Sequence, residues 1–138
     1  MKRYKKYSID EVRHMWETAP TKELKRKRKG VPYTLVVKGK IQIDDNITVK
    51  MDSDRYELFF TKGTTCVDCG MEGQYFWLEQ QEDQVGAAYH FNLYGLDNDG
   101  NEILMTKDHI IPKSKGGRNH IDNYQTMCVH CNGRKSNN

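Results

Sequence analysis

The chain reads Thr106-Lys107-Asp108-His109-Ile110-Ile111-Pro112 near its C-terminus, followed later by Cys128-Val129-His130-Cys131-Asn132-Gly133-Arg134-Lys135. An earlier stretch, Cys66-Val67-Asp68-Cys69, has the same spacing of two cysteines separated by two residues. Together these stretches decide the fold. Two cysteine pairs can join distant segments around one metal ion, and the second pair lies beside an Asp-His pair and a late Asn.

The four cysteines of the chain all belong to the two CxxC pairs. Two such turns can complete a tetrahedral Zn²⁺ site with Zn–S distances of about 2.3 Å. We therefore expect a structural zinc ion bound by Cys66, Cys69, Cys128 and Cys131. Disulfides, which suit a secreted protein, and free thiols are the alternatives. The basic start at residues 1–6 is not followed by an apolar run, so we expect no signal peptide.

Length and composition are those of one domain without a membrane span. The chain has 138 residues, of which 36% are hydrophobic, a modest content for a core. A structural zinc would add folding free energy on the order of 10 kcal/mol. No stretch approaches the roughly 20 apolar residues that cross a bilayer. We expect a cytoplasmic protein.

Charge is segregated along the chain, although its net value is only +3. Residues 1–30 carry eleven Lys/Arg and four Asp/Glu, residues 31–106 carry five and thirteen, and residues 107–138 carry six and two. The two basic ends suit a polyanion, because phosphate contacts dominate nucleic-acid affinity. The alternative is a solvated or disordered basic run. The residues predicted to bind nucleic acid are Lys25, Arg26, Lys27, Arg28, Lys29, Lys113, Lys115, Arg118, Arg134 and Lys135.

Local patterns predict an N-terminal helix followed by short strands. Ser8 and Glu11 form a capping box, and apolar residues then follow helical spacing until Pro20. The basic run that ends at Gly30 reads as a linker or arm. We therefore divide the chain into an N-terminal helix with a basic arm, residues 1–30, and a β-rich domain, residues 31–138.

Later patterns predict a series of strands and one C-terminal helix. The turn Asp97-Asn98-Asp99-Gly100 signals a hairpin. A helix of about two turns is expected over Val129 to Ser136, with Lys135 three residues beyond Asn132 on the same side. The predicted strands span residues 34–37, 40–43, 47–51, 56–60, 74–78, 88–96, 102–109 and 124–128.

Over residues 66–137 the chain resembles the HNH family of nucleases. The residues that carry this resemblance are the Asp108-His109 pair, Asn123, Asn132 and the four cysteines. The resemblance implies an α+β fold whose core, residues 102–137, is the ββα-metal unit of strand, loop, strand and helix. A four-cysteine zinc site would pin this core. The N-terminal helix and the remaining strands are additions to it.

The resemblance also implies roles for individual residues. Asp108 and Asn132 would bind a catalytic divalent cation, and their oxygen atoms favour Mg²⁺ or Mn²⁺. His109 would be the general base that activates water, and Asn123 would orient the loop that carries it. The family often has His in the place of Asn132, and Asn there keeps an oxygen ligand. Asp108 and His109 would point to opposite faces of a regular strand, so their convergence would need a twist or break.

The implied function is a metal-dependent endonuclease that hydrolyses phosphodiester bonds in DNA, by nicking or by double-strand cleavage. The alternative is a non-catalytic, zinc-stabilised module that binds nucleic acid. Such a module needs the cysteines but has no use for Asp108, His109 and Asn132 together. One site cuts one strand, so double-strand cleavage requires a second event or a second copy, as in a homodimer. Small chains of this family often come from phages or mobile elements, which would place the protein in the host cytoplasm.

Overall fold

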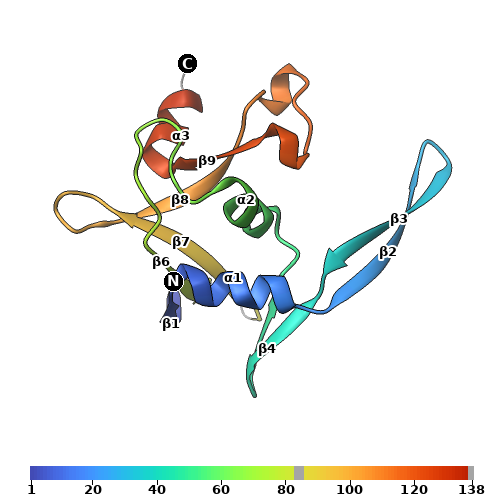
Figure 1. Cartoon of the computed structure of the whole chain (residues 1–138), viewed down its shortest axis with the longest axis horizontal. Coiled ribbons are helices and arrows are strands. Elements are labelled where there is room, and N and C mark those ends of the chain that lie inside the picture. Colours follow the sequence, from blue (N-terminus) through green and yellow to red (C-terminus); the bar gives the residue numbers. More distant parts are fainter. Residues whose placement is uncertain (83–85, 137–138) are drawn as a thin grey trace.

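The computed structural model describes residues 1–82 and 86–136, so the last residues of the predicted domain and core lie outside it. Its centre is an antiparallel sheet in the order β1-β6-β7-β8-β9 (Figure 1). The bounds of these strands are β1 Lys2–Tyr7, β6 Tyr75–Gln80, β7 His90–Leu96, β8 Glu102–His109 and β9 Tyr124–Cys128. The sheet and the helices give the α+β fold expected from the sequence.

The first helix, α1, spans Ile9–Thr18 and begins at the predicted capping box. The Ser8 hydroxyl accepts from the Glu11 amide at 3.0 Å, and the Glu11 carboxylate accepts from the Ser8 amide at 2.9 Å. These bonds satisfy amides that a helix start leaves without partners. The apolar stripe of α1 buries Val12 fully and packs Trp16 against the core, as its spacing predicted.

The prediction of a strand over residues 56–60 is wrong, because the chain forms helix α2, Asp54–Lys62, there. The Ser53 hydroxyl caps it by accepting from the Arg55 amide. Tyr56 and Phe59 lie three residues apart on one helix face and are buried. A short apolar run fits a buried helix as well as a strand, so the spacing of the apolar residues in this run could not distinguish the two structures.

The basic run that ends at Gly30 is part of a β-hairpin and not the predicted linker or arm, while the predicted strand over residues 34–37 lies in the second strand of this hairpin. Strand β2, Thr21–Arg28, pairs antiparallel with β3, Val31–Lys38, through a turn in which Lys29 and Gly30 have φ of 51° and 79°. Figure 1 shows this hairpin reaching away from the central sheet. The proposed boundary between residues 30 and 31 falls in its turn, and the division into two units stays a prediction.

The remaining predicted strands are confirmed. A second small hairpin joins β4, Lys40–Asp44, to β5, Ile47–Lys50. Strands β6, β7 and β8 follow, and Gly100, with φ of 82°, lies in the predicted turn between the last two. Strand β1 was not predicted. It is basic and largely exposed, and it joins the sheet by pairing with β6.

The two faces of the central sheet differ in chemistry. One face buries Phe76 and Phe91, which contact aromatic residues of α2. On the other, the Arg3 guanidinium lies 4.5 Å from the centre of the Trp77 ring and bonds to Glu79 and Glu102. Glu79 is only 2% exposed, so this pairing offsets the cost of burying its charge.

The C-terminal core has the predicted order of strand, loop, strand and helix. Strand β8 runs into a loop with two short 3₁₀ turns, η1 at Lys113–Lys115 and η2 at Ile121–Asn123, and β9 returns along β8. Helix α3 spans Val129–Ser136, as predicted. No helix in the described part of the chain is long and apolar enough to cross a membrane.

Candidate metal and catalytic site

The four cysteines gather at one point, although 59 positions separate Cys69 from Cys128. Their sulfur atoms all lie within 4.8 Å of one another, and none is in a disulfide. A tetrahedron with Zn–S bonds of 2.3 Å separates its sulfurs by about 3.8 Å. The Cys69 and Cys128 sulfurs are 3.8 Å apart. The cluster therefore fits a tetrahedral metal ion with four thiolate ligands.

Backbone contacts hold this cluster and set the charge of its thiols. The Val67 amide donates to Thr126 O at 2.9 Å, which ties the first cysteine turn to β9. Burial opposes ionisation of Cys66, but backbone amides including those of Cys69 and Cys128 lower its thiol pKa to about 6. Burial and the neighbouring thiols raise the pKa of Cys131. Four ionised sulfurs this close need a cation between them, which zinc would supply.

Asp108 is held on the face of β8 that α3 covers. Its side chain is 9% exposed, and its Oδ2 accepts from Lys135 Nζ at 2.6 Å and from Gln125 Nε2 at 2.9 Å. Gln125 lies directly opposite Asp108 in the β8–β9 register, and such partners share a face. The carboxylate is thus fixed from both the strand and the helix.

Helix α3 directs Asn132 and Lys135 to this same face of β8, as the predicted helical spacing requires. Asn132 Nδ2 donates to Thr106 Oγ1 at 2.9 Å, while Lys135 Nζ also donates to the carbonyl of His109 at 2.6 Å. No described residue donates to the Asn132 side-chain oxygen. A groove of about 530 Å³ is lined by Asp108, Asn132, Lys135 and His109 among others.

The His109 imidazole lies at the end of β8, and His109 lines the same groove as Asp108. His109 pairs with Tyr124 in the β8–β9 register, and the two rings meet edge to face with centres 5.1 Å apart. His109 Nε2 lies 2.8 Å from Asn119 Oδ1. The side chains of Asp108 and His109 share no hydrogen-bond partner among the described residues. Strand β8 ends at His109, so the backbone turns immediately beyond the pair.

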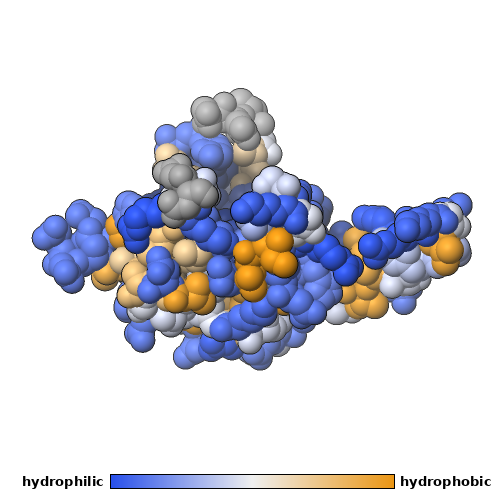
Figure 2. Space-filling model, turned by 90° about the horizontal axis from the view of Figure 1, so that it is seen from above, coloured by the Kyte–Doolittle hydropathy of each residue, from blue (hydrophilic) through white to orange (hydrophobic). Residues whose placement is uncertain are grey.

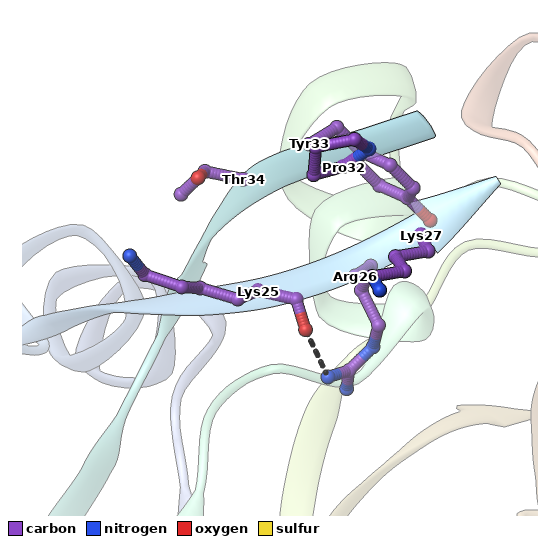
Figure 3. Close-up of a pocket in the computed structure, with 6 residues that line it drawn as sticks. All are labelled: Lys25, Arg26, Lys27, Pro32, Tyr33 and Thr34. Carbon is purple, nitrogen blue, oxygen red and sulfur yellow. Dashed lines mark hydrogen bonds between the residues drawn. The ribbon is translucent and has the colours of Figure 1, made fainter. Parts of the chain in front are cut away.

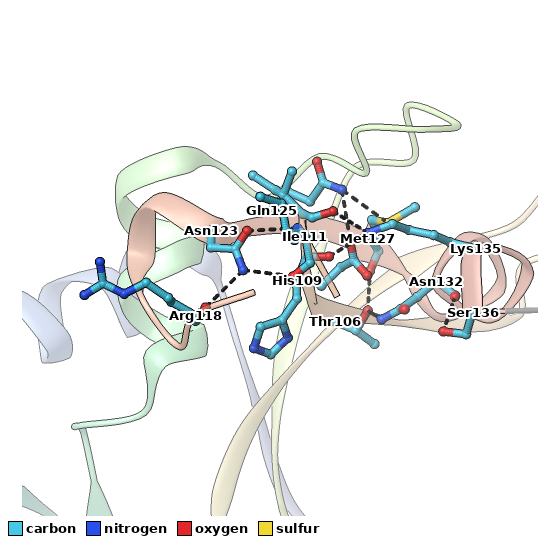
Figure 4. A network of polar contacts seen from close by, with 12 residues as sticks. Thr106, His109, Ile111, Arg118, Asn123, Gln125, Met127, Asn132, Lys135 and Ser136 are labelled. Atoms are coloured by element: carbon cyan, nitrogen blue, oxygen red, sulfur yellow. Dashed lines mark hydrogen bonds and ion pairs between the residues drawn. The ribbon is translucent and has the colours of Figure 1, made fainter. Parts of the chain in front are cut away.

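Asn123 fastens the loop that follows His109 (Figure 4). Its Oδ1 accepts from the Ile111 amide at 2.9 Å, and its Nδ2 donates to the carbonyls of Ile111 and Arg118 at 3.1 and 3.0 Å. A side chain at Gly117 would clash with the Ile111 carbonyl, since an added Cβ would lie 1.7 Å from that oxygen. Asn123 and Gly117 thus fix the path of the chain beside His109.

The predicted DNA contacts divide into four places. Lys113, Lys115 and Lys135 line the groove. Arg118 lies in a neighbouring depression beside Asn123, and Arg134 donates from Nη2 to Cys131 Sγ at 3.0 Å. The Lys25–Lys29 run is on the β2–β3 hairpin.

Sequence reasoning missed three residues that contact the candidate site. Gln125 and Thr106 bond to Asp108 and Asn132, and Asn119 bonds to His109. The antiparallel register could have found Gln125, because the predicted strands place it across from Asp108. Asn119 lies in an irregular loop, where no spacing rule indicates its direction.

Comparison with known protein families found a match over the part of the chain that holds this groove. Residues 97–138 match the family model described as HNH endonuclease. No curated protein and no solved structure matches the chain. The match covers the β8, β9 and α3 elements with Asp108, His109, Asn123 and Asn132. Over residues 97–138, the chain is similar to the HNH endonuclease family.

Proposed function

We propose that this protein is a metal-dependent endonuclease that hydrolyses phosphodiester bonds in DNA and acts in the cytoplasm. The observation that carries the proposal is the placement of Asp108 and Asn132 on one groove, from β8 and from α3. A module that only binds nucleic acid gains nothing from a largely buried carboxylate facing a groove, because burying a charge costs free energy. The family match supports the same reaction class.

Asp108 and Asn132 are the residues that would hold the catalytic divalent cation. Both offer oxygen ligands, which suit Mg²⁺ or Mn²⁺. When bound, such a cation supplies positive charge to the scissile phosphate and to the leaving 3′ oxygen. Gln125 and Thr106 keep the two ligand side chains in place. Lys113 and Lys115, which line the groove, bind the flanking phosphates of the DNA.

His109 is the proposed general base, and its neighbour fixes which nitrogen acts. Because the Asn119 side-chain oxygen can only accept, the hydrogen between them belongs to His109 Nε2. In the neutral ring Nδ1 is then free to take a proton from the attacking water. Asn119 is thus a positioning residue, and Asn123 holds the loop around it.

The cysteine cluster has a structural role in this proposal. It joins the segment after α2 to the end of β9 and the start of α3, and so fixes the helix that carries Asn132. Zinc is the proposed ion, since four thiolates in a tetrahedral arrangement are a common structural zinc site.

Relaxation of supercoiled plasmid tests the proposal. The protein should nick the plasmid when Mg²⁺ or Mn²⁺ is added and not without a divalent ion. Asp108→Ala and Asn132→Ala should need more metal and recover part of their rate at raised Mn²⁺. Plasmid binding without nicking under every metal condition would overturn the nuclease and favour the binding module.

A further inference from the structure

The β2–β3 hairpin, residues 21–38, carries a concentrated positive charge that the proposed cleavage site does not use. We call it the basic ribbon. It has seven Lys/Arg and one acidic residue, Glu23, for a net charge of +6, whereas the whole chain has only +3. The remainder of the chain is therefore net negative, and the attraction of a polyanion is concentrated on this ribbon.

The basic ribbon stands free of the rest of the molecule (Figures 1 and 2). Apolar side chains are exposed on it among the charged ones, with Val31 and Val36 at 64% and 66%. Within the described part of the chain, the contacts that anchor the ribbon lie at its base. The Gly39 amide donates to the Pro20 carbonyl, and the Lys38 ammonium lies 5.1 Å from the centre of the Trp16 ring. An isolated two-stranded hairpin is only marginally stable in water, so a bound partner would stabilise this one.

The strand register gives the ribbon two different faces. Residues directly opposite share a face, so Arg26 lies beside Tyr33 and Arg28 beside Val31. The other face pairs Lys25 with Thr34. Figure 3 shows Lys25 and Arg26 extending in different directions from β2. One face therefore combines guanidinium groups with apolar side chains, and the other presents lysines.

We propose that the basic ribbon enters the major groove of duplex DNA with its arginine face against the base edges. The inference rests on the proposed function and adds to it the element that positions the substrate. The major groove is about 12 Å wide and admits a two-stranded ribbon. Eight residues of strand span about 27 Å, most of one turn of the duplex. Arg26 and Arg28 can each bond to guanine through two nitrogens, and Val31 and Tyr33 can contact thymine methyl groups.

Two double variants separate groove insertion from general attraction to phosphate. The double variant Arg26→Gln with Arg28→Gln removes the two guanidinium groups from the arginine face. The double variant Lys25→Gln with Lys27→Gln removes the same amount of positive charge from the lysine face. Both are made in the His109→Ala protein and measured without divalent metal, so that the DNA stays intact. These side chains are exposed, so circular dichroism and thermal melting should show both variants folded.

The probes are a duplex enriched from a randomised library by the His109→Ala protein, and a random duplex of equal length. The arginine variant should lose about 5- to 150-fold of the preference for the enriched duplex per base contact removed. The lysine variant should keep that preference while its affinity becomes less salt-dependent. Glucosylated 5-hydroxymethylcytosine, which fills the major groove, should abolish the preference.

Three results would overturn the inference. These are equal loss of preference in the two variants, a preference that survives glucosylation, and equal binding of a single strand. Nicking is measured separately, with the same ribbon variants made in the protein that retains His109. Ribbon-dependent preference without nicking would refute the nuclease and leave the ribbon standing, whereas nicking with no ribbon effect would refute the ribbon alone.

Discussion

Replacing Lys135 by Met should raise the affinity of the groove for Mn²⁺. The Lys135 ammonium lies 2.6 Å from Asp108 Oδ2, on the carboxylate that is proposed to bind the divalent ion. Metal binding at that oxygen must displace the ammonium or compete with it. Methionine keeps most of the apolar stem of lysine and removes the charge.

The size of the effect follows from the bond that is removed. A hydrogen bond to a charged group contributes about 1.5–3 kcal/mol, which corresponds to about 10- to 100-fold in an equilibrium constant. The Lys135 side chain is 32% exposed, so solvent screening places the gain toward the lower end. The same bond stabilises the fold without metal. The variant should therefore melt at a lower temperature than the original protein and recover more when Mn²⁺ is added.

Titration calorimetry of Mn²⁺ into the zinc-loaded protein measures this directly. Lys113→Met is the matched control, because Lys113 lines the same groove and contacts no carboxylate among the described residues. It should change Mn²⁺ affinity much less. Mn²⁺ affinity that stays the same or falls in Lys135→Met would refute the competition between ammonium and metal at Asp108.

Three further predictions concern the scaffold. Cys128→Ser should release zinc and most of the folded state, and unchanged metal content with an unchanged melt would contradict the metal cluster. Asn123→Ala should lower the nicking rate at least tenfold with zinc content retained, since it frees the loop after β8; a rate equal to that of the original protein would show that the clamp is dispensable. Burial would raise the pKa of Glu102, but hydrogen bonds from Tyr75, Arg3 and Trp77 lower that pKa below its ordinary value of 4.5. The ionised Glu102 carboxylate therefore stabilises the fold above pH 4.5, and this stabilisation is lost as the pH falls through the lowered pKa. Glu102→Gln should therefore flatten the acid limb of the melting temperature against pH, and an unaltered limb would contradict this.

The sequence predicted the C-terminal core well because its signals are local and agree with one another. The turn at Asp97–Gly100 marks the hairpin between β7 and β8, and the helix over Val129–Ser136 has the predicted bounds. The gathering of the two cysteine pairs also followed from their spacing alone. The turn and the helix depend on residues a few positions apart, where periodicity and turn chemistry are decisive. The cysteine pairs lie 59 positions apart, and the need of one metal ion for four ligands predicted their meeting.

The failures lie where distant contacts determine the structure. Strand β1 is basic and has no apolar alternation, yet Arg3 bonds to Glu79 and Glu102, far along the chain. The run Lys25–Lys29 carries like charges that favour an open chain, but pairing with β3 makes residues 25–28 part of a strand, and Lys29 lies in the turn. At the candidate site, the direction of His109 depends on Asn119, which lies in an irregular loop and which no spacing rule connects to it.

The most direct test of the central claim is single-turnover cleavage of supercoiled plasmid. The rate of the His109→Ala protein is compared with the rate of the His14→Ala protein. His14 is exposed on α1, outside the groove, and serves as the matched control. His109→Ala should lose a factor of about 10²–10⁴ in the rate of strand cleavage. It should keep its zinc, its melting temperature and its affinity for DNA, while His14→Ala should cleave as the original protein does. Cleavage by His109→Ala at the rate of His14→Ala would contradict the assignment of the general base.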